Sequence, residues 1–154
     1  MENKFDKINT IEDIINILGN DDIDVIHYNN LISDVNTKKY DIAEYAIILI
    51  AKVYNEGWVP DWSNSNESKW YNWFRWNPST SRFVFSDTGY VYWGAFTSGG
   101  SRLCFREESL AAFAANRFSD FYNQYYTKFF NKDKRIYKEY HYKGILKEKE
   151  YYIW

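Results

Sequence analysis

Cysteine is almost missing from this chain, and proline and long apolar runs are scarce too. Only Cys104 among the 154 residues is a cysteine, so an internal disulfide is excluded and a reducing, cytosolic compartment is favoured. The longest apolar run, Ala46 to Ala51, is far too short to span a bilayer. The N-terminus MENKFDKINT lacks the apolar stretch of a secretory signal. We therefore expect a cytoplasmic protein with no membrane partner.

Motifs for metal binding and for common hydrolytic chemistry are missing as well. The two histidines, His27 and His141, lie far apart, and no HxH, HExxH or CxxC spacing occurs, which argues against a standard zinc site. A GxSxG nucleophile motif is absent. Cys104 stands between Leu103 and Phe105, where a buried, inert thiol is commoner than a nucleophile. We therefore predict a protein that is not an enzyme and needs no cofactor.

The chain also lacks a strong excess of one charge, although its charges are unevenly distributed. The formal net charge is −2, so no global field points to long nucleic acid or to a membrane as partner. Residues 1–57 carry 5 basic and 11 acidic side chains, residues 58–130 carry 7 and 6, and residues 131–154 carry 7 and 4. The acidic first third fits a solvated helical face, or a surface for a basic partner.

Aromatic residues, by contrast, are abundant, and they gather in the middle of the chain. Phe, Trp and Tyr make up 21% of the residues, and residues 58–105 hold six of the seven Trp. Four runs there have the composition and alternation of β-strands, and turn-forming residues separate them. The expected strands are Trp70–Trp76, Arg82–Ser86, Tyr90–Phe96 and Ser101–Phe105, with turns at Asn77-Pro78, at Asp87-Thr88-Gly89 and at Ser98-Gly99-Gly100. This pattern predicts an antiparallel meander.

The N-terminal third has the signals of a short helix followed by an irregular stretch. Thr10, followed by Asp13, is typical of an N-cap with an acidic first turn, and Gly19 is a typical helix end. We therefore predict a helix from Ile11 to Leu18. Residues 21–37 are rich in Asp and Asn, which favours a loop with a short helical or extended piece.

A second helix is expected from Lys38 to Glu56. Asn36 or Thr37 is a suitable N-cap, and Gly57 is a suitable left-handed stop. Its middle is apolar nearly all round, which is typical of a central, buried helix. Its expected core residues are Ile42, Ala46, Leu49, Ile50 and Val53.

Residues after the meander predict a third helix and a charged tail. Apolar residues recur at helical spacing from Glu107 to Phe130. The tail is rich in Lys, Glu and Tyr, and two patterns fit it. Ile136–Tyr142 and Ile145–Ile153 would form a hairpin because Tyr and Ile favour strands, or the tail would extend the helix.

Together these elements predict a single α+β domain. Its parts are a helical region (1–57), an aromatic β-meander (58–105), a helix (106–130) and a Tyr- and Lys-rich tail (131–154). We expect a small antiparallel four-stranded sheet packed with the N-terminal helices and with the long helix after it. A sheet that is apolar on both faces is covered on both, or leaves an aromatic face for a ligand, a protein or a second copy of the chain.

Two segments carry a resemblance to a known family. They are Asn55–Trp62 (NEGWVPDW) and Gly100–Phe105 (GSRLCF), with the aromatic run KWYNWF between them. On these segments the chain resembles a family of small uncharacterised proteins encoded by phages and prophages of gut bacteria, over about Ile8 to Tyr126. Gly99, where the family usually has a bulkier residue, and residues 131–154 depart from the pattern. The resemblance implies a phage protein in the host cytoplasm and no particular chemistry.

The turn between the third and fourth expected strands is the main candidate for a ligand site. Its glycines allow close backbone approach, its N–H groups can form an anion nest, and Ser and Arg side chains add donors. A hairpin turn whose arginine pairs with a carboxylate is the commoner use of such a segment. The candidate phosphate-binding residues are Ser98, Gly99, Gly100, Ser101 and Arg102.

Aromatic and arginine side chains elsewhere in the meander add a stacking surface. Base stacking on an aromatic ring contributes about 1–3 kcal/mol per base, although core packing accounts for most of the rings. Interleaved rings and guanidinium groups fit a nucleotide better than a neutral sugar. The further expected ligand-binding residues are Arg75, Arg82, Trp62, Trp73, Tyr92 and Trp93.

These features lead to one functional hypothesis and two alternatives. The hypothesis is a phage accessory protein of the counter-defence type that sequesters a small phosphorylated nucleotide through ring stacking and phosphate contacts. The first alternative is a protein-binding inhibitor or adaptor of a host factor. The second is a structural component of the virion.

Overall fold

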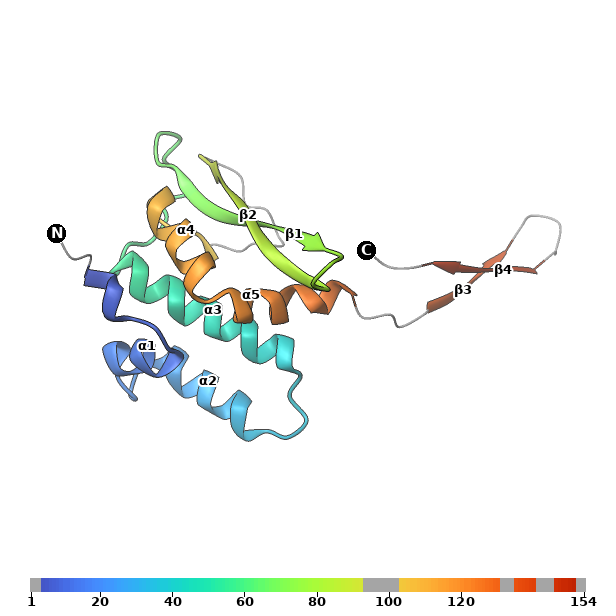
Figure 1. Cartoon of the computed structure of the whole chain (residues 1–154), viewed down its shortest axis with the longest axis horizontal. Coiled ribbons are helices and arrows are strands. Elements are labelled where there is room, and N and C mark those ends of the chain that lie inside the picture. Colours follow the sequence, from blue (N-terminus) through green and yellow to red (C-terminus); the bar gives the residue numbers. More distant parts are fainter. Residues whose placement is uncertain (1–3, 93–102, 131–134, 141–145, 152–154) are drawn as a thin grey trace.

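The computed structural model describes residues 4–92, 103–130, 135–140 and 146–151 of the chain (Figure 1). Helices and strands alternate in blocks, with helices first, then a strand pair, then helices, then a second strand pair. In chain order the elements are η1 (Lys4–Lys7), α1 (Ile11–Leu18), α2 (Ile23–Ser33), α3 (Lys39–Asn55), β1 (Lys69–Asn77), β2 (Arg82–Val91), α4 (Glu108–Arg117), α5 (Ser119–Tyr126), η3 (Thr127–Phe130), β3 (Arg135–Tyr140) and β4 (Leu146–Tyr151).

Helix α3 is the centre of the fold. Helices α1 and α2 pack on one side of it and α4 and α5 on the other, while β1 and β2 lie on the far side of α4 and α5 (Figure 1). The N-terminal helices therefore pack mainly on α3, whereas we had expected them on the sheet. An apolar residue on any side of α3 has another helix to contact, which is why its middle is apolar nearly all round.

The predicted core of α3 is largely confirmed. Ala46, Leu49 and Ile50 are fully buried, Val53 is nearly so, and Ile42 is half-buried. The helix ends as predicted with left-handed backbone, at Glu56 (φ 51°) and Gly57 (φ 80°). The predicted N-cap is wrong by one or two residues, because Lys38 holds that position without a side-chain cap. Within the described ranges, no helix is long and apolar enough to cross a membrane.

Helix α1 begins and ends where the sequence predicts. The Thr10 hydroxyl accepts a hydrogen bond from the Asp13 backbone N–H at 3.1 Å, and the Asp13 carboxylate accepts one from the Thr10 N–H at 2.9 Å. This reciprocal capping box satisfies N–H groups that a helix start leaves without partners. Gly19 ends the helix with φ of 89°, a value that favours glycine.

Helix α2 replaces most of the loop that we expected between α1 and α3. Asp22 caps its first turn by accepting from the Asp24 N–H at 2.9 Å. Val25 and Tyr28 are buried against the rest of the protein. The abundance of Asp and Asn concealed this helix, because the same residues are typical of both caps and loops.

The predicted four-stranded sheet is wrong. In the described residues, β1 pairs with β2 in an antiparallel two-stranded sheet. The described part of the expected fourth strand pairs with this sheet through one isolated bridge, between Trp70 and Phe105. Two backbone hydrogen bonds form this bridge, at 2.8 and 2.7 Å. Leu103 and Cys104 are not in a strand, and most of the expected third strand lies outside the described residues.

Strand β2 runs straight through Asp87-Thr88-Gly89, where we expected a turn. The register shifts between Trp73 and Phe74, which leaves Ser86 as an extra residue in β2. Such a bulge lets a long strand continue alongside its partner. Gly89 serves close packing here, since an added Cβ would lie 2.5 Å from the Trp73 indole nitrogen. The turn between β1 and β2 does lie at Asn77 and Pro78, as predicted.

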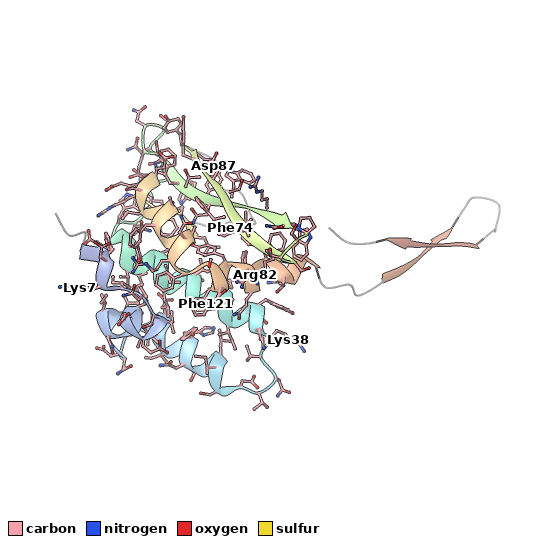
Figure 2. The ribbon with its side chains drawn as sticks, viewed as in Figure 1. Lys7, Lys38, Phe74, Arg82, Asp87 and Phe121 are labelled. Carbon is pink, nitrogen blue, oxygen red and sulfur yellow. The ribbon has the colours of Figure 1, made fainter. Side chains whose placement is uncertain are left out.

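The inner face of the sheet, turned toward α4 and α5, is packed with rings. Phe74 lies between the sheet and the helices (Figure 2), with its ring stacked on Tyr122 at a centroid distance of 4.8 Å. The ring of Phe83, on β2, contacts the ring of Tyr126, on α5, with their centroids 5.3 Å apart. These contacts fix which face of each strand is turned inward.

The single long helix that we predicted after the sheet is broken into α4 and α5. Phe118 departs from helical backbone at φ −110° and ψ 32°. Its ring is buried and packs edge-on against Tyr54 of α3. Because neither Gly nor Pro occurs there, the break follows from tertiary packing and not from a local stop signal.

Strands β3 and β4 in the tail form an antiparallel pair. Their register runs from Arg135 opposite Tyr151 to Tyr140 opposite Leu146. Of the two alternatives that the sequence leaves for the tail, this pairing corresponds to the hairpin.

Candidate functional site

The outer face of the β1–β2 sheet, turned away from α4 and α5, is the candidate ligand surface. Successive side chains of a strand point to opposite faces, so Tyr71, Trp73 and Arg75 share this face. Tyr71 is half-buried, whereas Trp73 and Arg75 are exposed. We call these three residues the outer strip.

Trp73 is the most exposed tryptophan of the sheet, at 56%. Its indole lies over Gly89 of the neighbouring strand, and Tyr71 packs edge-on against it at 5.7 Å between ring centroids. The ring is therefore supported on one side and open to solvent elsewhere. An exposed ring that is already held in place loses little conformational freedom when it binds a planar group.

Arg75 supplies a positive charge beside this ring. Adjacent same-face residues of a strand lie roughly 7 Å apart, which places the guanidinium within reach of a ligand on Trp73. Arg75 makes no ion pair with any residue in the described part of the chain, whereas Arg82 pairs with Asp120 of α5. Asp87, opposite Trp73 in β2, is the nearest acidic residue by register. An anion on this face would therefore sit at the Arg75 end.

The structure separates the residues that we predicted as one site. Ser98, Gly99, Gly100, Ser101, Arg102 and Trp93 lie outside the described residues. Trp73 and Arg75 come together on the outer strip. Arg82 lies at the far end of the sheet in its ion pair, and Trp62 and Tyr92 lie at the other end, near Lys69.

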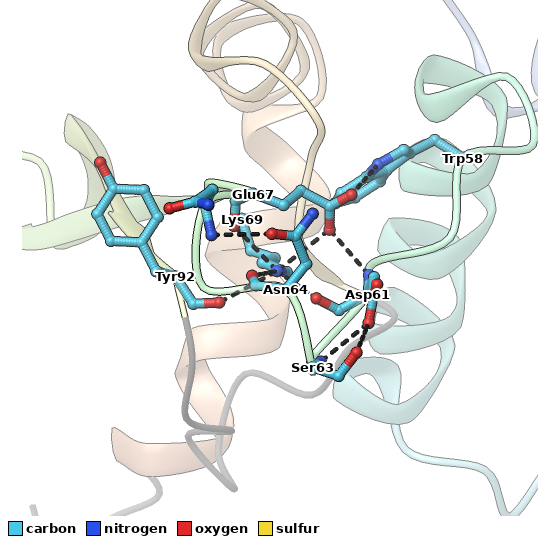
Figure 3. A network of polar contacts seen from close by, with 8 residues as sticks. Trp58, Asp61, Ser63, Asn64, Glu67, Lys69 and Tyr92 are labelled. Atoms are coloured by element: carbon cyan, nitrogen blue, oxygen red, sulfur yellow. Dashed lines mark hydrogen bonds and ion pairs between the residues drawn. The ribbon is translucent and has the colours of Figure 1, made fainter.

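Lys69, at the start of β1, binds the segments at the end of the sheet near Trp62 and Tyr92 (Figure 3). Its side chain is fully buried, and its ammonium nitrogen lies 2.5 to 3.1 Å from the backbone oxygens of four residues. The Glu67 carboxylate adds a fifth acceptor at 3.1 Å. The four backbone acceptors belong to Asp61, Asn64, Glu67 and Tyr92. One ammonium group thus holds the 58–68 loop against the end of β2.

The Glu67 carboxylate also holds Trp58, at the start of this loop. Its carboxylate accepts hydrogen bonds from the Trp58 indole N–H at 3.3 Å and from the Asp61 N–H at 2.8 Å. Burial acts to raise the pKa of Glu67, but these bonds and Lys69 outweigh it, so the pKa lies below its ordinary value. The carboxylate therefore stays charged beside the Lys69 ammonium.

Sequence reasoning missed Lys69. A lysine at the start of an aromatic strand is usually exposed to solvent. Nothing in the neighbouring sequence indicates that Lys69 is buried. The available signal was the Asn- and Ser-rich loop before it, whose carbonyl groups turn back toward a common centre once the chain folds.

No family model matches the chain, and neither a curated protein nor a solved structure matches it. Function therefore has to be inferred from the residues themselves.

Cys104, the chain's one cysteine, is buried. Burial raises the pKa of the Cys104 thiol to about 11, so the thiolate form is scarce near neutral pH. This agrees with the predicted buried, inert thiol. Among the described residues, no group of three His, Cys, Asp or Glu side chains is placed to hold a metal ion.

Proposed function

We propose that this chain is a non-catalytic binding protein whose ligand is a small phosphorylated nucleotide, held on the outer strip of the sheet. The observation that supports this is an exposed, supported indole (Trp73) beside an exposed guanidinium (Arg75) that has no ion pair with any described residue. The base would stack on Trp73, and the phosphate would accept hydrogen bonds from Arg75.

The biological setting follows from the resemblance to phage and prophage proteins. A protein that binds a nucleotide without converting it lowers the free concentration of that nucleotide by mass action. In an infected cell, such a protein would act against a defence system that signals through a nucleotide.

Isothermal titration of the protein against a panel of cyclic and linear nucleotides tests the proposal. We expect heat with at least one member, and a loss of about 1–3 kcal/mol of binding free energy in Trp73→Ala. Trp76→Ala is the matched control, because Trp76 is on the same strand but packs on Phe83 on the inner face.

Arginine variants form the second arm of this experiment. Arg75→Gln should weaken binding of phosphorylated ligands and leave nucleosides unaffected, while Arg82→Gln should change neither. No heat with any nucleotide, from protein that is well folded, would refute the proposal.

A specific observation favours the protein-binding alternative. The outer sides of α1 and α2 expose several large aliphatic side chains within the acidic third of the chain; they are Ile17, Ile23, Ile26 and Ile32. Exposed aliphatic residues in an acidic part of the chain fit a basic protein surface. Ile23→Ser should abolish capture of such a partner and leave nucleotide binding intact, whereas Arg75→Gln should have the opposite effect.

A further inference from the structure

A cleft of about 290 Å³ lies between the end of α3 and the 58–62 segment, apart from the outer strip. Trp58, Pro60 and Trp62 form one wall, and Ile48 of α3 forms part of the other. Its volume is close to the lower limit of small-ligand pockets. None of its lining residues belongs to the nucleotide surface proposed above.

The charge around this cleft is negative. Lys52 lines it and shares its ammonium with two carboxylates, at 2.6 Å to Asp22 and 2.9 Å to Asp24. The supporting loop adds Asp61 and the Glu67–Lys69 pair. Among the described residues named here, four carboxylates stand against two ammonium groups, and this balance favours a cation.

Carboxylate protonation does not remove this negative charge near neutral pH. The hydrogen bond from Lys52 holds the pKa of Asp22 below its ordinary value. Hydrogen bonds from Ser63 do the same for Asp61. The excess of negative charge is therefore permanent under physiological conditions.

The walls of the cleft favour a cation whose charged nitrogen is covered by methyl groups over one that carries N–H groups. The Asn55 amide, which also lines the cleft, already donates to the Cys104 carbonyl at 2.8 Å and accepts from the Arg106 N–H at 3.0 Å. The Trp58 N–H is likewise engaged by Glu67. Apart from Asp24 and Lys52, which pair with each other, the rest of the lining consists of two indoles and aliphatic groups. These are the surfaces that hold methylated ammonium groups.

Trp62 already has a cation on its ring. The Lys69 nitrogen lies 5.5 Å from the centroid of the Trp62 ring, and Lys69 is not among the residues that line the cleft. Because the Glu67 carboxylate neutralises Lys69, this internal cation adds little repulsion toward a second one at the cleft.

From this geometry we propose that the cleft binds a small, free quaternary ammonium compound of the choline type. The indoles of Trp58 and Trp62 contact its methyl groups, and the carboxylates around the cleft, at Asp22, Asp24, Asp61 and Glu67, attract its nitrogen. Lys69 is a positioning residue for this site because it holds the loop that carries Trp62.

A pair of isosteric probes tests the proposal on the unmodified protein. Choline and 3,3-dimethylbutan-1-ol have the same shape, but only choline is charged. In isothermal titration we expect choline to bind about tenfold more tightly than the alcohol. Equal affinity for the two compounds, or no binding of choline, would overturn the proposal.

Variants locate the binding and remain informative if one of them folds poorly. Trp62→Leu keeps an apolar wall but removes the indole, so choline affinity should fall several-fold, and Trp62→Phe should fall less. Asp24→Asn should weaken choline and leave the alcohol unchanged. Unaltered choline affinity in both Trp62→Leu and Asp24→Asn, checked against Trp76→Ala, would place the site elsewhere.

A vesicle experiment separates the free compound from a lipid head group. Co-sedimentation with phosphatidylcholine vesicles, without binding of free choline, would contradict the proposal as stated. The choline and alcohol probes carry no phosphate or base. A negative result with them therefore leaves the nucleotide proposal untouched, and a negative result with nucleotides leaves the choline proposal untouched.

Discussion

Lys69 and Asn55 show how single buried polar side chains join segments that are distant in sequence. Lys69 gathers the carbonyl groups of the 58–68 loop and of Tyr92, while the Asn55 amide bridges the end of α3 to Cys104 and Arg106. Burying such groups is costly unless they find partners, and here most of the partners are backbone groups of irregular segments. These two residues therefore determine where the irregular segments lie.

Removing the Lys69 charge should destabilise the protein strongly. Lys69→Met removes the buried ammonium group that neutralises the Glu67 carboxylate and donates to four backbone oxygens, and we expect a loss of about 3 kcal/mol in the free energy of unfolding. Urea denaturation followed by circular dichroism measures it. Lys52→Met is the matched control, because Lys52 is partly exposed and should cost less than about 1 kcal/mol. Equal losses of stability in the two variants would contradict the importance of the buried Lys69 ammonium group for stability.

Tyr54 and Tyr122 form a second matched pair. The buried Tyr54 hydroxyl has no hydrogen-bond partner in the described part of the protein, whereas the Tyr122 hydroxyl accepts from the Asn72 amide at 3.3 Å. Tyr54→Phe should therefore be neutral or stabilise the protein by about 1 kcal/mol, and Tyr122→Phe should cost about 1 kcal/mol. Thermal unfolding of both variants tests this, and a large loss in Tyr54→Phe would reveal a hydroxyl contact that the structure does not show.

At the scale of elements, helix ends followed local chemistry more faithfully than strands did. The Thr10–Asp13 capping box and Gly19 were sufficient to place α1, because their hydrogen bonds involve neighbours in sequence. In β2, the Asp87-Thr88-Gly89 stretch has the composition of a turn, yet nine residues of β1 are available as a partner along its length. Pairing along the whole strand outweighed the local preference, and the bulge absorbed the mismatch.

The caps give a prediction at this scale. Thr10→Ala should reduce stability by about 1 kcal/mol because it removes the side-chain acceptor of the capping box. Thr37→Ala should have no measurable effect, since Thr37 does not cap α3 in the structure although its position suggested it. Chemical denaturation of the two variants distinguishes them, and a similar loss for both would contradict an N-cap at Lys38.

The molecule as a whole is layered, with α1 and α2, then α3, then α4 and α5, then the β1–β2 sheet (Figure 1). Among the described elements, only α3 is covered on two sides by other helices. The outer strip lies on the sheet, which is an outer layer, whereas the cleft lies at the end of α3. A ligand on the outer strip therefore need not disturb the core.

The whole molecule should lose stability at both pH extremes. Hydrogen bonds lower the pKa of Asp13, Asp22 and Asp61, whose ordinary value is 3.8. Because folded pKa values below the unfolded ones favour the folded state at higher pH, this stability is present above about pH 4 and is lost as the pH falls through the folded pKa values.

At alkaline pH, the stability changes in the opposite direction with pH. Burial raises the pKa of Cys104 from 9.0 to about 11 and those of Tyr54 and Tyr126 from 10.0 to about 12. This stability is present below the unfolded pKa values and is lost as the pH rises from about 9 toward the folded ones. Denaturation midpoints between pH 2 and pH 11 test both limbs. A constant midpoint from pH 8 to pH 11 would contradict the burial of these groups.

The sequence by itself determined the features that depend on neighbours along the chain. These include the bounds of α1, the buried character of α3, the turn at Asn77 and Pro78, and the burial of Cys104. Only the tertiary structure decided what depends on distant partners. It paired β2 along its whole length, broke the last helix at Phe118, reduced the fourth strand to one bridge at Phe105, and buried Lys69 among carbonyl groups. Local hydrogen bonds can be inferred from sequence spacing, whereas burial of a charge or a ring requires atoms that only the folded chain brings together.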